Sequence, residues 1–232
     1  MVLLISPVSV HADEPKVQVS RPGFGTVEGT LEYEADSKRR WRYARYYVDR
    51  KTSRLAEAVI ALTPEDADLK FERPEPKTTE IDQKNFMFVP ETVAIRAGDR
   101  IRFLNSDRAV HNVAVAHIRH SFNVNLQPEQ AHEETFPYGR RVDLPYRIGC
   151  IYHSAMRAWI YVFDHPLFDM TEKNGVFRLI NVPPGEYTLD FVHPAGDLRL
   201  SKKITVAADS TQKFEITLSP DDLRPKKTDS KR

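Results

Sequence analysis

Residues 142–163 read VDLPYRIGCIYHSAMRAWIYVF, and this stretch decides the predicted fold. Residues of one parity in its first part are Val142, Leu144, Tyr146, Ile148 and Cys150. A period of two predicts a β-strand with one face turned to a core. Cys150 ends that strand, so its thiol should point toward the interior at the end of a sheet. A second run, residues 159–163, is apolar on both faces.

The chain before this stretch repeats the same pattern in short runs from Thr79 onward. Apolar residues of matching parity are Phe86 with Phe88, Val93 with Ile95, Ile101 with Phe103, Val113 with Val115, and Phe122 with Val124 and Leu126. Pro90 and the Ala97-Gly98-Asp99 turn separate these runs. Regular turns and no long helical periodicity predict an all-β sandwich.

Composition limits the class of protein further. The 232 residues suffice for one large domain or two small ones. A net charge of +1 does not favour nucleic acid as a partner. The N-terminus, residues 1–12, joins a short apolar run to a Val-His-Ala site, which predicts a cleaved signal peptide. No other segment is long and apolar enough to span a bilayer. We therefore expect an exported protein, periplasmic or otherwise extracytoplasmic.

The chain holds one cysteine, Cys150. An exported chain with a single cysteine forms no internal disulfide, so that thiol needs another explanation, such as a metal. Cys150, His153 and Met156 form a C-x-x-H-x-x-M loop. Soft sulfur ligands with imidazole suit copper, and two His with one Cys and a weak axial Met form the type 1 arrangement. His111, 39 positions before the cysteine, is the candidate second histidine.

The block from Ile81 to Phe163 resembles the cupredoxin family, and the short spacing between His153 and Met156 is most similar to amicyanin. Within that block it also resembles plastocyanin-like proteins of methylamine utilisation. The resemblance implies a Greek-key β-sandwich with one type 1 copper at its end. His111, Cys150 and His153 would be the strong ligands and Met156 the axial one. Asn112 would hold the ligand loop by a hydrogen bond.

Residues 171–189, TEKNGVFRLINVPPGEYTL, resemble the carboxypeptidase regulatory-like (transthyretin-like) domain. Residues 25–31 and 57–62 fit the opening strands of that family. The opening strands of this family thus lie before the cupredoxin-like block and the closing strands after it. This order predicts a split β-sandwich with an inserted domain. The predicted division is 13–75 and 165–219 for the split sandwich, 76–164 for the cupredoxin domain, and 220–232 for a disordered tail. Two consecutive domains with an extra N-terminal hairpin are the alternative. Asn174-Gly175 in this region predicts a hairpin turn between two strands.

The basic-aromatic segment, residues 38–51 (KRRWRYARYYVDRK), allows two interpretations. A solvated hairpin whose aromatic side chains pack on the sandwich is the favoured one. A docking surface for an acidic partner, or an arm that stacks on nucleic acid, is the other. Arg147 and Arg157 put positive charge beside the metal loop, which also favours an acidic redox partner.

The predicted function is non-enzymatic electron transfer between exported redox partners of unknown identity. A copper storage or delivery protein, and a structural module whose ligand loop is fixed by metal, are the alternatives. Zinc held by Cys and two His competes with copper, although Met is a poor zinc ligand. His117, His120 and His132 suggest a weaker second metal site, and their spacing matches no motif.

Overall fold

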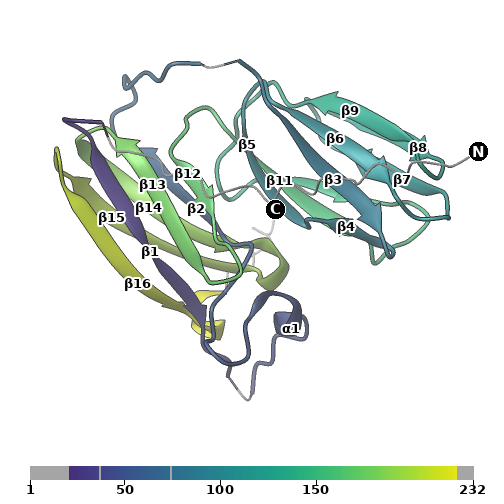
Figure 1. Cartoon of the computed structure of the whole chain (residues 1–232), viewed down its shortest axis with the longest axis horizontal. Helices are drawn as coiled ribbons and strands as arrows, with labels where there is room; N and C mark the ends of the chain where they lie inside the picture. The colour runs from purple at the N-terminus through teal and green to yellow at the C-terminus, as the bar shows by residue number, and fades with distance from the viewer. Residues whose placement is uncertain (1–20, 37, 74, 224–232) are drawn as a thin grey trace, which may run out of the picture.

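The computed structural model describes residues 21–36, 38–73 and 75–223, and nearly all its regular structure is β (Figure 1). Two β-sandwiches lie side by side (Figure 1). The site sandwich contains strands β3 to β11, and the flanking sandwich contains β1, β2 and β12 to β16. The predicted all-β sandwich architecture is confirmed.

The site sandwich packs a sheet of order β4-β3-β6-β9 on a sheet of order β5-β11-β10-β7-β8. Its strands are β3 (Thr78–Lys84), β4 (Met87–Val89), β5 (Thr92–Arg96), β6 (Arg100–Asn105), β7 (His111–Val115), β8 (Phe122–Leu126), β9 (Ala131–Thr135), β10 (Tyr146–Gly149) and β11 (Arg157–Phe163). Alternate residues of the two sheets fill one core, which includes Ile81, Phe103, Val113, Ile148 and Ile160. Cys150 and Met156 belong to the same buried cluster.

The flanking sandwich packs a sheet of order β13-β1-β16 on a sheet of order β12-β2-β14-β15. Its strands are β1 (Gly25–Tyr33), β2 (Val59–Pro64), β12 (Phe168–Met170), β13 (Val176–Val182), β14 (Gly185–His193), β15 (Leu198–Val206) and β16 (Thr211–Leu218). Strands from before and after the site sandwich therefore share both sheets. A split sandwich requires such pairing between strands from before and after an inserted domain. The division into domains stays a prediction.

A third buried cluster joins the two sandwiches. Val59 and Ala61 of β2, with Val192 of β14, pack against Trp159, Tyr161 and Phe163 of β11. The other parity of β11, with Ile160 and Val162, faces the core of the site sandwich. Strand β11, which carries the chain away from the predicted metal loop, is therefore enclosed on both faces.

Two details of the site sandwich differ from the sequence-based expectations. The strand predicted from Val142 begins only at Tyr146, because Pro145 interrupts it and Leu144 lies in a turn closed by a bond from its N–H to the carbonyl of Arg141. Val142 packs in the cluster between the sandwiches. Strand β9 was not predicted, since its sequence AHEET has no apolar face for a core.

Phe86 also departs from its predicted place beside Phe88 in one strand. Asn85 and Phe86 form the two-residue turn between β3 and β4, with φ of 55° and 59°. Positive φ at both central positions gives the twist that a tight β-hairpin needs, and Asn adopts it readily. The turn projects the phenyl ring out of the core, half exposed to solvent.

The flanking sandwich corrects three further expectations. The Asn174-Gly175 turn joins β12 and β13, which lie in different sheets, so it does not close a hairpin. The basic-aromatic segment holds a short helix, α1 (Ala44–Tyr47), instead of a hairpin. The predicted disordered tail began too early, because Ser219 caps a 3-10 helix, η2 (Pro220–Asp222), through a reciprocal capping box. A further 3-10 turn, η1, spans Pro194–Gly196.

The predicted signal peptide, residues 1–12, lies outside the described residues. Within the described part of the chain, no helix has the length and apolar character needed to cross a membrane.

Candidate metal centre

Cys150 follows the last residue of β10 and continues its inward-facing parity. Its side chain is buried, with 6% of the residue exposed. The backbone N–H of Asn112 donates to its Sγ over 3.3 Å. The following loop folds back on itself, since the N–H of Met156 donates to the carbonyl of His153 over 2.9 Å. We call residues 150–156 the ligand loop.

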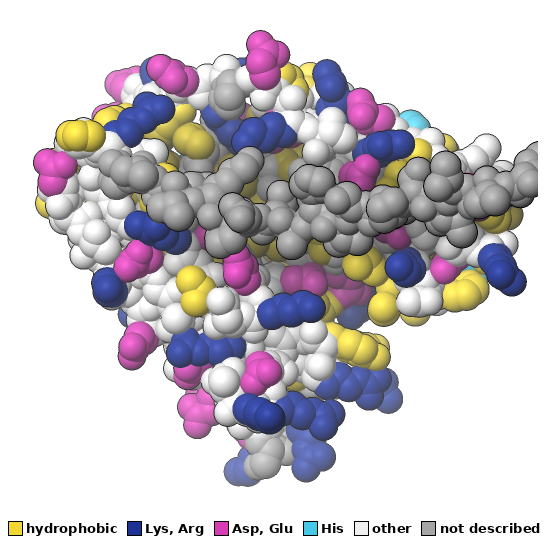
Figure 2. Space-filling model, in the orientation of Figure 1, with side chains coloured by type: hydrophobic (Ala, Val, Ile, Leu, Met, Phe, Trp, Pro, Cys, Tyr) yellow, Lys and Arg dark blue, Asp and Glu magenta, His cyan; other side chains and the backbone are white. Residues whose placement is uncertain are grey.

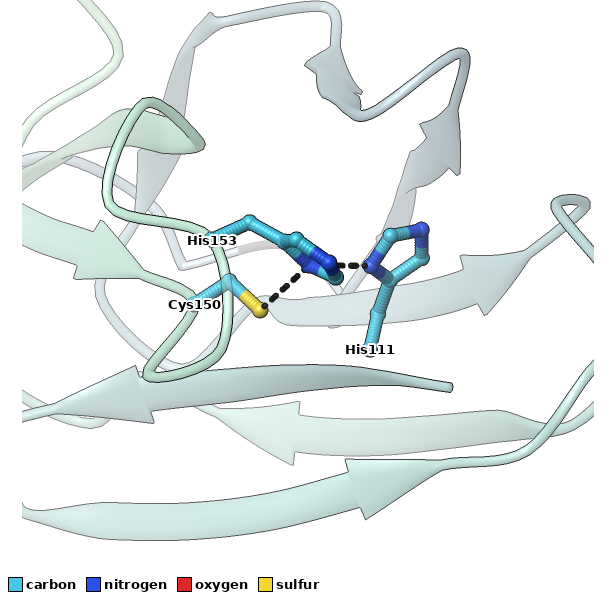
Figure 3. A group of neighbouring side chains, drawn as sticks. All are labelled: His111, Cys150 and His153. Atoms are coloured by element: carbon cyan, nitrogen blue, oxygen red, sulfur yellow. Dashed lines mark hydrogen bonds between the residues drawn. The ribbon is translucent and has the colours of Figure 1, made fainter. Parts of the chain in front are cut away.

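His111 begins β7, the strand next to β10, and is fully buried. Its Nδ1 lies 3.2 Å from Nδ1 of His153, which in turn lies 3.6 Å from Sγ of Cys150 (Figure 3). The three donor atoms all lie within 4.8 Å of one another. The structure therefore brings together three of the four predicted ligands, from two regions of the chain that are far apart in sequence.

The Nδ1–Nδ1 separation of 3.2 Å and the His153 Nδ1–Cys150 Sγ separation of 3.6 Å match one metal ion. Bonds of about 2.0 Å to nitrogen and 2.3 Å to sulfur, in tetrahedral geometry, separate the donor atoms by roughly 3.3–3.6 Å. Two imidazole nitrogens 3.2 Å apart also need a proton or a cation between them. Two imidazoles and one thiol, largely shielded from water, suit a soft or borderline transition metal.

Asp107 fixes the orientation of His111. Its Oδ2 lies 2.8 Å from Nε2 of that ring. Burial acts to raise the pKa of Asp107, but hydrogen bonds from the N–H of Phe86, from His111 and from the N–H of Asn85 outweigh it and hold the pKa below the usual value. An ionised carboxylate only accepts, so Nε2 carries the ring proton. Nδ1 is then the ring nitrogen that faces His153 and can offer a lone pair to an ion.

Asn112, predicted to hold the ligand loop, is fully buried next to it. Its Oδ1 accepts a hydrogen bond from the N–H of Ile151 over 3.4 Å. Its Nδ2 donates to the carbonyl of Val124 over 3.1 Å and to Oδ1 of Asn125 over 2.9 Å, both on β8. One amide thus ties the ligand loop to the neighbouring strand of the sheet.

Two more buried amides brace the strand that carries His111. Gln83 of β3 donates from Nε2 to the carbonyl of Asn112 over 3.0 Å. Asn105 donates from Nδ2 to the carbonyls of Ala109 and Leu126, each over 2.9 Å. Buried amides with fixed partners keep the loop before β7 and the strand itself in one arrangement.

Met156, the predicted axial ligand, is 2% exposed and packs in the same buried cluster as Cys150. Its carbonyl also accepts from the N–H of Cys150 over 3.4 Å, which closes the ligand loop. The side chain therefore lies on the interior side of the loop. Its role as a metal ligand stays a prediction.

Phe86 and Asp107 are site residues that the sequence analysis missed. The Phe86 ring meets the His111 and His153 rings edge-on, with centroid distances of 5.3 and 4.9 Å. Asp107 accepts from the N–H groups of Asn85 and Phe86 over 2.7 and 2.9 Å, so one carboxylate positions both the turn and the ligand. The asparagine in the Lys84-Asn85-Phe86-Met87 sequence was the available signal for a turn.

The ligand loop itself exposes two large apolar side chains, Ile151 at 60% and Tyr152 at 51% exposure. Arg147 is exposed on β10. Arg157 lies 3.9 Å from Glu91 and stacks over the rings of Tyr43 and Trp159, at 5.1 and 5.4 Å. The arginine next to Met156 thus contacts the flanking part of the molecule.

The suggested second metal site does not assemble in the described part of the chain. His120 and His132 each approach Glu134, at 3.5 and 3.0 Å, while His117 packs on the ring of Tyr146. Across the described residues, the one group of three or more His, Cys, Asp or Glu donor atoms within bonding reach of a single ion is His111, Cys150 and His153.

Comparisons with known proteins complete this description. No protein-family model matches the chain, and no curated protein matches it. Similar solved structures include amicyanin from Paracoccus versutus, with 22% identity, a TM-score of 0.33, and coverage of 44% of this chain and 96% of that one.

A purple cupredoxin from Nitrosopumilus maritimus is also similar, with 18% identity, a TM-score of 0.31, and coverage of 36% of this chain and 97% of that one. A copper-containing nitrite reductase from Thermus scotoductus has 22% identity and a TM-score of 0.34, with coverage of 45% and 26%. At this level of similarity these proteins do not decide the function of the chain. The resemblances to a transthyretin-like domain and to methylamine-utilisation proteins stay predictions.

Proposed function

We propose that the chain binds one copper ion through His111, Cys150 and His153, with Met156 as axial ligand, and acts as an electron carrier outside the cytoplasm. The observation that supports it is the convergence of three donor atoms: Nδ1 of His153 lies 3.2 Å from Nδ1 of His111 and 3.6 Å from Sγ of Cys150, and all three lie within 4.8 Å of one another. Copper is favoured over zinc because a buried thioether belongs to the same cluster as the thiol.

A bound copper ion would supply a one-electron couple, Cu(II) to Cu(I). The protein's own contribution is a rigid set of ligands. Asp107 holds the His111 ring, Asn112 holds the ligand loop, and the N–H of Asn112 donates to the cysteine sulfur. Ligands that do not move between the two oxidation states keep the rearrangement on electron transfer small.

The site is enclosed on one side and accessible on the other. His111 is fully buried, whereas His153 is half-buried in the ligand loop, among exposed Ile151 and Tyr152. Electrons would enter and leave through the His153 edge, where a partner can approach. In this proposal the chain transfers electrons without converting a substrate.

Copper reconstitution tests the proposal directly. The purified chain is mixed with one equivalent of Cu(II), and its visible and electron paramagnetic resonance spectra are recorded. We expect an intense blue thiolate-to-copper band, a narrow copper hyperfine splitting, and reversible bleaching through several cycles of ascorbate and hexacyanoferrate(III). Cys150→Ser should lose the band, and His132→Gln, a histidine outside the site, should keep it.

Four outcomes would contradict the proposal. A colourless complex that prefers Zn(II) would indicate a zinc site. Rapid transfer of the copper to a competing chelator would indicate storage or delivery. Unchanged colour in Cys150→Ser would place the metal elsewhere. A stable, redox-inactive complex whose loss only lowers the melting temperature would indicate a structural metal.

A further inference from the structure

We propose that the basic-aromatic segment, residues 38–51, is the docking surface for an acidic redox protein that exchanges electrons at the ligand loop. The proposal rests on the proposed electron-carrier function and adds to it a surface and the chemistry of the partner. It also assigns a task to the flanking sandwich, which carries this segment.

The charge of the segment differs sharply from that of the chain. The whole chain holds 34 Lys and Arg against 33 Asp and Glu. The segment holds one acidic residue, Asp49, and its basic residues are Lys38, Arg39, Arg40, Arg42, Arg45, Arg50 and Lys51. All seven basic side chains are exposed. Figure 2 shows dark-blue side chains gathered where Figure 1 places α1.

Most of this positive charge forms no salt bridge within the part of the chain that the structure describes. Arg39 pairs with Asp36 and Asp221, at 2.8 and 2.7 Å. Within the described residues, no salt bridge involves Arg40, Arg42 or Arg45. Unpaired charges of one sign in a cluster attract an oppositely charged surface and speed its approach.

The inner side of the segment is anchored. Trp41 stacks on Tyr47 with centroids 5.6 Å apart and planes 8° from parallel. Both rings meet the buried His193 edge-on, at 4.8 and 4.7 Å. The outer side leaves Tyr43 and Tyr46 at 39% and 58% exposure. An ordered surface rich in Arg and Tyr is the composition that protein interfaces favour.

Arg157 connects the segment to the ligand loop. It directly follows Met156, and its guanidinium stacks over the ring of Tyr43 at 5.1 Å. A partner seated on the segment therefore touches the strand that leaves the ligand loop. Ile151 and Tyr152 lie exposed on the same loop and offer apolar contact area beside the charged surface.

The same contacts argue against other anionic partners. One face of each exposed tyrosine is already covered by a guanidinium, Arg157 over Tyr43 and Arg45 over Tyr46 at 4.7 Å. Those faces are not free to stack on nucleic-acid bases. A helix that inserts into a membrane surface needs a continuous apolar face, and α1 has four residues, ARYY. An acidic protein fits better than either.

Binding to poly-L-glutamate, an acidic polypeptide probe, tests the surface. The variant Arg40→Glu/Arg42→Glu/Arg45→Glu is compared with Lys202→Glu/Lys203→Glu/Lys213→Glu, which makes the same charge change at exposed sites on β15 and β16. We expect the dissociation constant to rise at least tenfold in the arginine variant and to change less than twofold in the lysine variant. High salt should remove the difference.

The copper-loaded protein supplies the second readout. Oxidation of the reduced site by anionic hexacyanoferrate(III) should slow severalfold in the arginine variant alone, with its blue band unchanged. Equal losses in both triple variants would overturn the proposal, because bulk charge would then explain them. Tighter binding of the unmodified chain to phosphatidylserine vesicles or to single-stranded DNA than to poly-L-glutamate would also overturn it.

Cys150→Ser separates this proposal from the proposed function. The variant should still bind poly-L-glutamate at full strength, since the surface does not depend on metal. A chain that binds no copper but retains selective acidic binding would refute the electron carrier and preserve an acidic-protein docking surface. A blue, redox-active chain without selective binding would refute the docking surface alone.

Discussion

The two sandwiches share an architecture but differ in where they bury polar groups. Each packs two sheets around an apolar core. In the flanking sandwich the buried polar residues have separate local partners: Thr171 accepts from the N–H of Ala58, and His193 contacts the carbonyl of Ala56. In the site sandwich Gln83, Asn105 and Asn112 all hold the backbone around His111.

This difference shows where chemistry enters a stable fold. Apolar packing supplies most of the folding free energy in both halves, and a buried amide contributes little net stability. Three buried amides around one strand therefore serve to fix positions. In the site sandwich these buried amides hold three donor atoms in place, which explains why polar groups are buried there.

Core truncations in each half give the largest expected effect. Phe103→Ala and Phe191→Ala each remove a ring that is 0% exposed and should lower the free energy of unfolding by about 3–5 kcal/mol. Urea denaturation measures it. Only Phe103 shares a cluster with Cys150, so folded Phe191→Ala should keep an unaltered copper spectrum. Loss of the spectrum in folded Phe191→Ala would show that the flanking core shapes the site.

Matched changes of buried polar residues sharpen the comparison. Asn112→Ala should weaken copper binding by about 10- to 100-fold, because it frees the ligand loop from β8. Thr171→Ala removes the hydroxyl that accepts from the N–H of Ala58 in the flanking sandwich. It should cost about 1–3 kcal/mol of stability and leave copper binding unchanged. Competition titration against a chelator of known affinity distinguishes these outcomes.

The flanking sandwich should respond to acid through its buried histidine. Burial lowers the pKa of His193 to about 3, so the folded state binds fewer protons than the unfolded state between that pH and 6.5. The contribution of His193 to the free energy of unfolding is therefore constant above pH 6.5. On acidification it falls by up to about 1.4 kcal/mol per pH unit, and it levels off below about pH 3.

Burial also lowers the pKa of His165, to about 4, and adds to the same slope. His193→Gln should reduce the slope by one proton between pH 5.5 and 4.5, as measured by urea denaturation at several pH values. An identical slope in the variant would mean that His193 is protonated in the folded state.

The smallest effect is expected at the site's outer edge. Phe86→Ala removes two edge-on contacts with imidazole rings and should cost about 0.5–1 kcal/mol of the unfolding free energy. Ile118→Ala, at a side chain that is 98% exposed, should change it by less than about 0.5 kcal/mol. Thermal melts of both variants provide the comparison, and equal costs would mean that the Phe86 ring does not brace the imidazoles.

The sequence predicted the all-β architecture and the convergence of His111, Cys150 and His153 for identifiable reasons. Period-two patterning placed Ile148 and Cys150 on one face, and the structure puts both in the same core. Donor chemistry within a seven-residue loop then pointed to His111 across the sheet. The first inference depends on local spacing, which a sequence displays directly, and the second on the histidine that a copper ligand set still lacked.

The supporting residues escaped prediction because their roles depend on tertiary contacts. Asp107 lies in a loop four residues before His111. The neighbouring sequence does not indicate that its carboxylate binds both the turn between β3 and β4 and the imidazole of His111. Phe86 matched the parity of Phe88, although the backbone turns at that point. Val142 matched the parity of Tyr146 but packs in a different cluster.

Strand β11 has a consequence for cooperativity. It leaves the ligand loop at Arg157, and its two faces contribute to two separate cores, one through Ile160 and the other through Tyr161. Unfolding of either half would expose the apolar residues on one face of that strand to water. The two halves should therefore melt in a single transition, so that a destabilising change in either half lowers one shared melting temperature.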